Sequence, residues 1–159
     1  MKRLILFFAA IIISQTTMAQ TKIFNGAWFD INYPSNFIAK GSLKSTTSHG
    51  FESAIFKSPN NLVEFYIFSP QWNGRATDIL LKAKEKLSSS KSEINGDVET
   101  KWWTITSSDG SYSRSYQQKY NKSQNTIWII GIKYKNASAF EKYKKQYAFF
   151  KNSLIQYAD

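Results

Sequence analysis

Residues 126–134 have the sequence TIWIIGIKY, and this stretch decides the fold. Its large apolar side chains occupy both odd and even positions, so a strand formed here has no polar face. Such a strand must be covered on both sides, which places it inside a sheet rather than at an edge. We therefore expect a central strand at 126–134 with other parts of the chain packed on either face.

Five other segments have the alternation, or the β-branched and aromatic content, that is typical of strands. They are residues 28–33, 51–57, 62–69, 98–107 and 112–120. Asp109-Gly110 between the last two predicts a hairpin, because both residues tolerate a positive φ. The turn-forming tetrapeptide Ser58-Pro59-Asn60-Asn61 predicts another. With the central strand, these segments predict a six-stranded antiparallel sheet.

Two segments have the spacing of amphipathic helices. In residues 77–87 the apolar side chains form one stripe at helical spacing, and in residues 139–157 aromatic residues recur every three or four positions. Ser138 and Glu141 predict a capping box for the second helix, whereas residues 91–97 are typical of a polar linker. A sheet with two such helices predicts an α+β fold, with helices on both faces as in an α/β/α sandwich.

The pattern of core and turn positions resembles the PsbP/Mog1-like family. The resemblance rests on the early strand ending in Tyr33-Pro34, on the segment GFESAIFKSP at 50–59, and on the strand Trp128–Ile132 followed by a C-terminal helix. It covers most of residues 24–157 and includes no catalytic position. It implies an antiparallel sheet between helices and a non-enzymatic role in binding protein partners. Photosynthetic members bind photosystem II, and the Mog1 branch binds a small GTPase.

The N-terminus has the pattern of a secretory signal peptide. Lys2 and Arg3 precede an apolar run of ten residues at 4–13, and Thr17-Met18-Ala19 resembles a cleavage site. The apolar run is shorter than the roughly 20 residues of a membrane span. We therefore expect a signal peptide at 1–19, cleavage near Ala19-Gln20, and a single PsbP-like domain at 20–159 in the periplasm or outside the cell, where the mature form has no membrane span.

Composition narrows the classes of site that the chain can hold. The 159 residues contain no cysteine and one histidine, and the net charge is +10. A disulfide scaffold, a cysteine nucleophile and any site with two imidazoles are therefore excluded. The sequence has no clear carboxylate–histidine cluster and no phosphate-binding glycine loop, so we expect neither a metal nor another cofactor. The metal binding reported for photosynthetic PsbP proteins has no matching residues here.

Two catalytic arrangements remain as alternatives. Glu52 and Glu64 lie on the two arms of the first predicted hairpin, and a close carboxylate pair facing across the strands is typical of a glycosidase. His49 lies in a polar loop and could serve an esterase only together with a serine and an acidic residue beside it. The chain has no G-x-S-x-G sequence, which would hold such a serine in a strained turn. A secreted hydrolase is therefore an alternative function, and a carrier of small apolar ligands is another.

The leading hypothesis is a secreted, non-enzymatic binding module in the envelope or extracellular space. Its predicted contact residues are aromatic side chains and lysines that would face a protein partner or an acidic surface. They are Trp72, Trp103, Lys133, Lys135, Lys142, Lys144 and Lys145. Trp102 and Trp103 are adjacent in one predicted strand and must point to opposite faces. We do not expect nucleic acid as a partner, because secretion removes the protein from it.

Overall fold

The computed structural model describes residues 20–157, so the predicted signal peptide at 1–19 lies outside the described residues. In chain order the elements are β1 (Thr21–Asn25), β2 (Phe29–Pro34), β3 (Ile38–Gly41), β4 (Ser53–Lys57), β5 (Val63–Phe68), the 3-10 turn η1 (Thr77–Ile79), β6 (Glu85–Asn95), β7 (Val98–Ser107), β8 (Ser113–Asn121), β9 (Thr126–Tyr134), α1 (Ala137–Asn152) and β10 (Ile155–Gln156).

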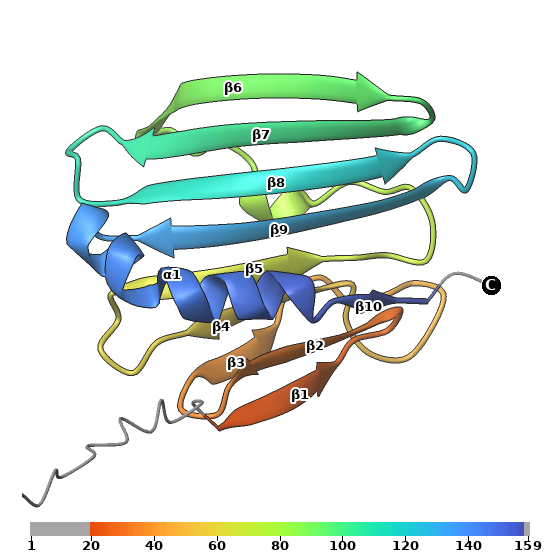
Figure 1. Ribbon diagram of the computed structural model, residues 1–159, viewed down its shortest axis with the longest axis horizontal. Coiled ribbons are helices and arrows are strands. Elements are labelled where there is room, and N and C mark those ends of the chain that lie inside the picture. The colour runs from red at the N-terminus through yellow and green to blue at the C-terminus, as the bar shows by residue number, and fades with distance from the viewer. Residues whose placement is uncertain (1–19, 158–159) are drawn as a thin grey trace, which may run out of the picture.

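Seven strands form one antiparallel sheet in the order β3-β4-β5-β9-β8-β7-β6 (Figure 1). The apolar strand β9 lies at its centre, as the sequence predicts. β6, an 11-residue strand with a register shift between Leu87 and Ser89, forms one edge. A smaller sheet, β1-β2-β10, is separate from the large one.

The two faces of the large sheet are covered differently. On one side, here called the helix face, α1 and the small sheet pack over β4, β5 and β9 (Figure 1). Their shared core contains Phe29 of β2, Phe56, Phe65 and Phe150 of α1, all fully buried. Alternation along β9 explains this, because Ile130 and Ile132 enter this core while Ile127 and Ile129 enter the core on the other side.

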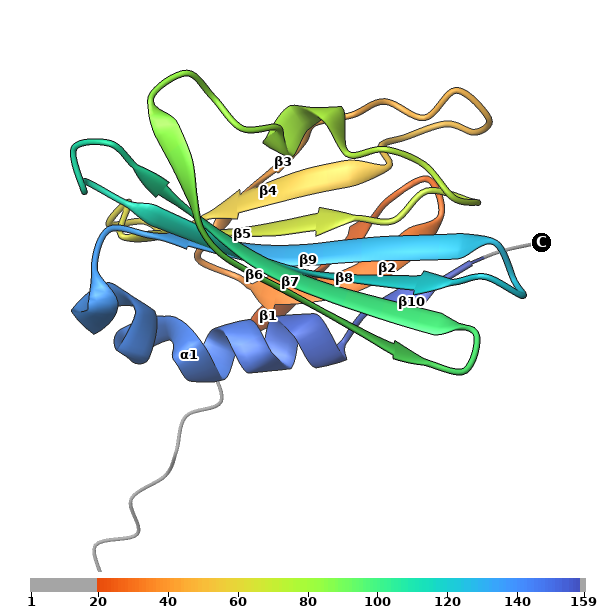
Figure 2. The same ribbon diagram turned by 90° about the horizontal axis from the view of Figure 1, so that it is seen from above.

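The opposite side, here called the open face, is covered by the irregular segment 69–84 rather than by a helix. Figure 2 shows α1 on one side of the sheet and the short turn η1 on the other. The smaller core under this segment contains Tyr66, Phe68, Ile105 and Tyr116. Because the segment is narrow, it leaves apolar surface of the sheet exposed beside it.

The predicted helix at 77–87 is wrong. Only Thr77–Ile79 is helical, as one 3-10 turn, and the strand β6 already begins at Glu85. The cause is tertiary: Arg114 donates hydrogen bonds to the backbone oxygens of Ile79 and Leu80 at 2.8 and 3.0 Å. An α-helix would need those carbonyls for its own hydrogen bonds.

Further expectations need correction. Residues 91–95 of the predicted linker belong to β6, and the strand predicted at 28–33 is β2 of the small sheet. With β3 and β6 added and β2 removed, the large sheet has seven strands instead of six, and a helix covers one face instead of both. The C-terminal helix ends at Asn152, and Ile155–Gln156 pairs with β2. Its N-cap is Asn136, whose Oδ1 accepts the Ala139 N–H at 2.9 Å, rather than the predicted Ser138.

Candidate functional site on the open face

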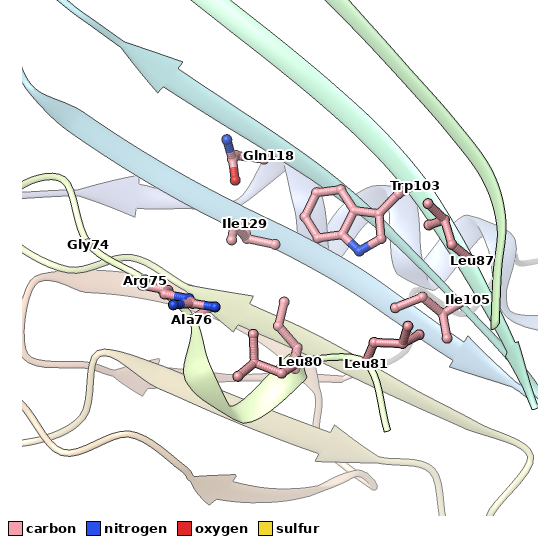
Figure 3. A pocket seen from close by; sticks show the side chains of 11 residues that line it. Gly74, Arg75, Ala76, Leu80, Leu81, Leu87, Trp103, Ile105, Gln118 and Ile129 are labelled. Carbon is pink, nitrogen blue, oxygen red and sulfur yellow. The ribbon is translucent and has the colours of Figure 1, made fainter. Parts of the chain in front are cut away.

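An apolar groove of about 370 Å³ lies between segment 69–84 and the outer strands of the open face. Its lining includes Leu80, Leu81, Leu87, Trp103, Ile105 and Ile129. In Figure 3 the Trp103 indole lies on the sheet side, opposite Leu80 and Leu81. Leu80 is 46% exposed and Leu81 and Leu87 are each 55% exposed. The incomplete cover of this face therefore leaves three large aliphatic side chains facing solvent.

Trp103 is the aromatic floor of the groove. Its ring stacks on Tyr116 with the centroids 5.2 Å apart and the planes 26° from parallel. Trp102 points to the helix face, where the Lys91 Nζ lies 5.2 Å from its ring centroid. Both tryptophans are half-buried. The expected opposition of the two side chains is confirmed, and Trp103 is the one that lines a cavity.

A buried ion pair holds the cover segment against the sheet. The Arg114 Nη2 lies 2.5 Å from the Glu85 Oε2, and their side chains are 6% and 1% exposed. The Arg114 Nε donates a second bond to the other carboxylate oxygen at 2.9 Å. Because Glu85 begins β6 and Arg114 lies in β8, the pair fixes where the segment ends on the open face.

The surroundings of Glu85 keep this carboxyl ionised. Burial alone would raise its pKa, but hydrogen bonds from Arg114, the Lys82 N–H and the Tyr112 hydroxyl outweigh burial and lower the pKa to about 2. Burial likewise would lower the pKa of Arg114, and Glu85 reverses this effect, so that pKa is raised. The pair is charged at every physiological pH.

A second polar contact holds the middle of the segment. Asp78 accepts hydrogen bonds from the Tyr66 hydroxyl and the Ser53 hydroxyl, both at 2.7 Å. Burial, followed by the charge of Asp78, raises the pKa of Tyr66, so the phenol stays protonated and donates. Segment 69–84 is therefore held to the sheet through Asp78 and through Glu85, the residue that follows it.

A second hollow of about 290 Å³ lies near the ends of β5 and β9. Its lining includes Lys57, Glu64, Ser111, Lys133 and Lys135. The Lys133 Nζ lies 3.5 Å from the Glu64 Oε1 and 4.4 Å from the centroid of the Tyr112 ring. Two of the predicted binding lysines, Lys133 and Lys135, therefore meet at one cavity.

The other predicted contact residues lie elsewhere on the surface. Lys142, Lys144 and Lys145 are exposed on α1, and the Lys144 Nζ is 3.5 Å from Glu141. Trp72 is exposed in the loop that also carries Gly74 and Arg75 of the groove lining. The structure thus brings Trp103 to the groove and two lysines to the second hollow, but it does not bring all seven residues together.

The proposed carboxylate pair does not form. Lys57, not Glu52, is the cross-strand partner of Glu64, and Glu52 precedes β4 next to Ser53, which pairs with Phe68. The two glutamates therefore lie at opposite ends of the hairpin. Glu52 instead accepts a hydrogen bond from the Ser45 hydroxyl at 3.0 Å. The geometric basis for a glycosidase is absent from this hairpin.

The remaining chemical candidates are also unsupported by contacts. His49 is exposed, and within residues 20–157 it has no side-chain hydrogen bond to a serine or a carboxylate. In the same range no three acidic or histidine side chains lie close enough to hold a metal ion. No helix in the described part of the chain is long and apolar enough to cross a membrane.

Sequence reasoning missed the two residues that shape the open face, Arg114 and Glu85. A usable indication existed for Arg114, because it shares a strand face with Tyr112 and Tyr116. An arginine between two aromatic residues on a covered face must be paired. Nothing in the sequence identifies Glu85 as its partner, since the predicted helix assigned that residue to a different element.

Comparison with known proteins gives a fold but no close relative. No protein-family model matches the sequence, and no curated protein matches it either. The solution structure of cyanobacterial PsbP (CyanoP) from Synechocystis sp. PCC 6803 matches with a TM-score of 0.53 and 9% identity, covering 91% of this chain and 96% of that one. The Ran-binding protein Mog1p of Saccharomyces cerevisiae has a TM-score of 0.47, 8% identity, and coverage of 88% and 97%. The chain therefore has the PsbP/Mog1-like fold that the sequence resemblance implied.

Proposed function

We propose that this protein is a secreted, non-enzymatic accessory module that binds a protein partner through the groove on its open face. The observation that carries the proposal is the exposure of Leu80, Leu81 and Leu87 around Trp103. Scattered exposed leucines are common, but a group of them around a tryptophan in a concave site is typical of an interaction surface. Binding energy at protein interfaces concentrates in such aromatic-centred pockets.

Polar residues beside the apolar centre of the groove favour a protein as its partner. Arg75 and Gln118 are polar residues of the lining, and Trp72 lies in the same loop as Arg75. An apolar centre with a polar and cationic rim is the usual composition of a protein interface. The PsbP/Mog1-like resemblance implies the same class of role, and the separation of Glu52 from Glu64 leaves the rival hydrolase without its carboxylate pair.

The test is affinity capture from the host's envelope extract with three forms of the tagged mature protein at low and high salt. The first is wild type, the second carries Leu81→Ser and Leu87→Ser, and the control carries Ile94→Ser. Ile94 is 64% exposed on the same strand as Leu87 but is not among the residues that line the groove. All three forms should unfold at the same denaturant concentration, because the replaced side chains are already largely solvated.

We expect one stoichiometric partner with wild type and with the Ile94 control at both salt concentrations, and at least about tenfold less with the double variant, since two interface leucines contribute over 1.4 kcal/mol. Equal recovery with all three forms would contradict the proposal. A broad set of proteins that high salt removes would mean that the lysines bind acidic surfaces without specificity.

A carrier of small apolar ligands is the second candidate, and the size of the groove favours it. Its volume of about 370 Å³ falls within the roughly 300–1,000 Å³ of small-molecule pockets. Titration with Nile red would show saturable one-to-one binding and quenching of Trp103 fluorescence if the groove holds such a ligand. The Leu81→Ser, Leu87→Ser variant would then lose that binding, and the Ile94 control would keep it.

A further inference from the structure

Charged side chains form a row across four strands of the open face. Lys57 in β4 lies opposite Glu64 in β5, Glu64 opposite Lys133 in β9, and Lys133 opposite Arg114 in β8. Residues paired in this way across antiparallel strands project to the same side, with Cβ atoms about 5 Å apart. The sheet therefore places three cations and one carboxylate in a line.

The acidic residues do not balance this row. Glu85 is occupied by Arg114, as both of its carboxylate oxygens accept hydrogen bonds from that guanidinium. Glu64 is then the single carboxylate between two lysines, and it lies 3.5 Å from Lys133. Lys135 adds a further cation to the same hollow. Within residues 20–157 neither Lys57 nor Lys135 forms an ion pair, so a positive excess remains.

The hollow beside this row has room and hydrogen-bond donors for a small anion. Its volume is about 290 Å³, and Ser111 and Asn61 are in the lining with the lysines. The aromatic ring of Tyr112 beneath the Lys133 ammonium limits where that charge can move. Lysine heads held around a concave surface attract an oxyanion more strongly than lysines scattered on a convex one.

We propose that this hollow, hereafter the lysine hollow (Lys57, Lys133 and Lys135), binds a phosphate or carboxylate group. Glu64 occupies part of the site in the free protein and competes with the ligand for Lys133. The ligand group lies between Lys57 and Lys135 and takes over the Lys133 ammonium. The proposal does not depend on the apolar groove, because the residues of the two sites do not overlap.

The test is a titration of the mature protein with sodium phosphate at pH 7 and constant ionic strength, followed by amide chemical shifts. Chloride replaces phosphate in the reference series. A matched pair of variants separates a site from general attraction: Lys57→Gln with Lys135→Gln removes two charges at the hollow, and Lys142→Gln with Lys145→Gln removes two on α1. All four lysines are exposed, so neither variant is expected to unfold.

We expect saturable shifts at Ser111 and Tyr112 with wild type and with the α1 variant. The hollow variant should bind about tenfold or more weakly, because it lacks two of the ammonium groups that attract the anion. Glu64→Gln should bind more tightly than wild type, since it removes the competing carboxylate. Equal weakening in both lysine variants, no saturation, or weaker binding by Glu64→Gln would each overturn the proposal.

A second series distinguishes the source of the anion. Citrate and a short glutamate peptide supply carboxylates, and inorganic phosphate supplies a phosphoryl group without carbon. Preference for phosphate at equal charge would assign the site to phosphorylated ligands, and preference for citrate or the peptide would assign it to carboxylates. The two proposals fail separately, because their sites share no residue. Equal protein capture by the groove variant and wild type would contradict only the groove, and phosphate shifts that do not saturate would contradict only the lysine hollow.

Discussion

Arg114 joins β8 to the cover segment and to the start of β6. It binds both oxygens of Glu85 and the backbone oxygens of Ile79 and Leu80. Without the guanidinium, the Glu85 carboxylate would keep its hydrogen bonds from the Lys82 N–H and the Tyr112 hydroxyl but lose its cation, and two carbonyls would lose their donor. A buried polar group that loses its hydrogen-bond partner lowers the stability of a protein far more than an exposed one does. Replacing Arg114 therefore tests how much its contacts stabilise the open face.

Arg114→Met should lower the free energy of unfolding by about 3–5 kcal/mol, because it leaves Glu85 charged and unpaired in the interior. Urea denaturation followed by tryptophan fluorescence measures this loss. Lys144→Met removes one partner of the exposed pair with Glu141 and should change stability by about 0.5 kcal/mol or less. A similar small change for both variants would mean that solvent reaches the Arg114 site.

Stability should also depend on pH through Glu85. The folded pKa of about 2 lies below the ordinary value of 4.5, so the stabilising contribution is complete above about pH 4.5 and is lost as the pH falls toward 2. A shift of this size corresponds to about 3 kcal/mol. Asp109 titrates in the same range, since the Ser111 N–H holds its pKa near 2.

The matched variant is therefore Glu85→Gln, which removes this titration but keeps Asp109. Its stability should be lower than that of wild type at pH 6, and it should fall less between pH 4.5 and pH 2.5. Urea midpoints at these three pH values measure the difference. Parallel curves for the two proteins would refute the assignment of the acid sensitivity to Glu85.

At the scale of elements, the sequence predicts strands well where the local pattern and the tertiary environment agree. The central strand at 126–134 and the hairpin around Asp109-Gly110 are confirmed. Residues 77–87 have helical spacing, yet Arg114 takes their carbonyls and β7 pairs with the residues that follow. Partners outside the segment decided this element, with Arg114 35 residues away from Ile79, and helix periodicity contains no information about them.

The turn between β6 and β7 contains a sequence signal for the hairpin that these two strands form. Asn95 pairs with Val98, and Gly96 between them has a φ of 58°. The loop is therefore Gly96-Asp97, and a glycine at the first position of a two-residue loop is typical of a hairpin, but the polar residues before it do not look like a strand. An edge strand with little to bury has little apolar pattern to recognise.

Gly96→Ala should destabilise the protein by roughly 1–2 kcal/mol, because a residue with a Cβ is strained at this φ. The added Cβ would meet no atom within 4 Å, so the cost is conformational and not steric. Gly96→Asn should recover most of the loss, since asparagine adopts this conformation more readily. Guanidinium denaturation of the three proteins compares them. Equal stability of the alanine variant would mean that the hairpin does not need a positive φ.

For the whole molecule, the sequence predicted the class of fold but not the asymmetry of its two faces. The strand at 126–134, which is apolar on both faces, required cover on both sides, and the helix face has it in α1. The open face instead has a narrow segment held by polar contacts, and the groove exists because that segment is not a helix. Trp103 could be placed on a face from its neighbour Trp102, whereas the leucines of the groove could not be recognised before the segment was located.

The proposed secretion has a direct test. If residues 1–19 are a signal peptide, the protein recovered from the host's envelope or medium should begin at Gln20. N-terminal sequencing or intact mass measurement gives the answer. Replacing the apolar run at 4–13 with polar residues should retain the precursor inside the cell. Recovery of an uncleaved chain starting at Met1 outside the cell would contradict the predicted cleavage.

The long outer strand β6 has a consequence for how concentrated the protein can become. Its outer backbone groups have no partner strand in the large sheet, and such a row is a template on which identical molecules can stack into fibres. The register shift after Leu87 and the sequence SSSKSE at 88–93 work against stacking, because the strand is twisted and charged there. Ser90→Val together with Ser92→Val would make this edge more apolar and more prone to nucleate fibres.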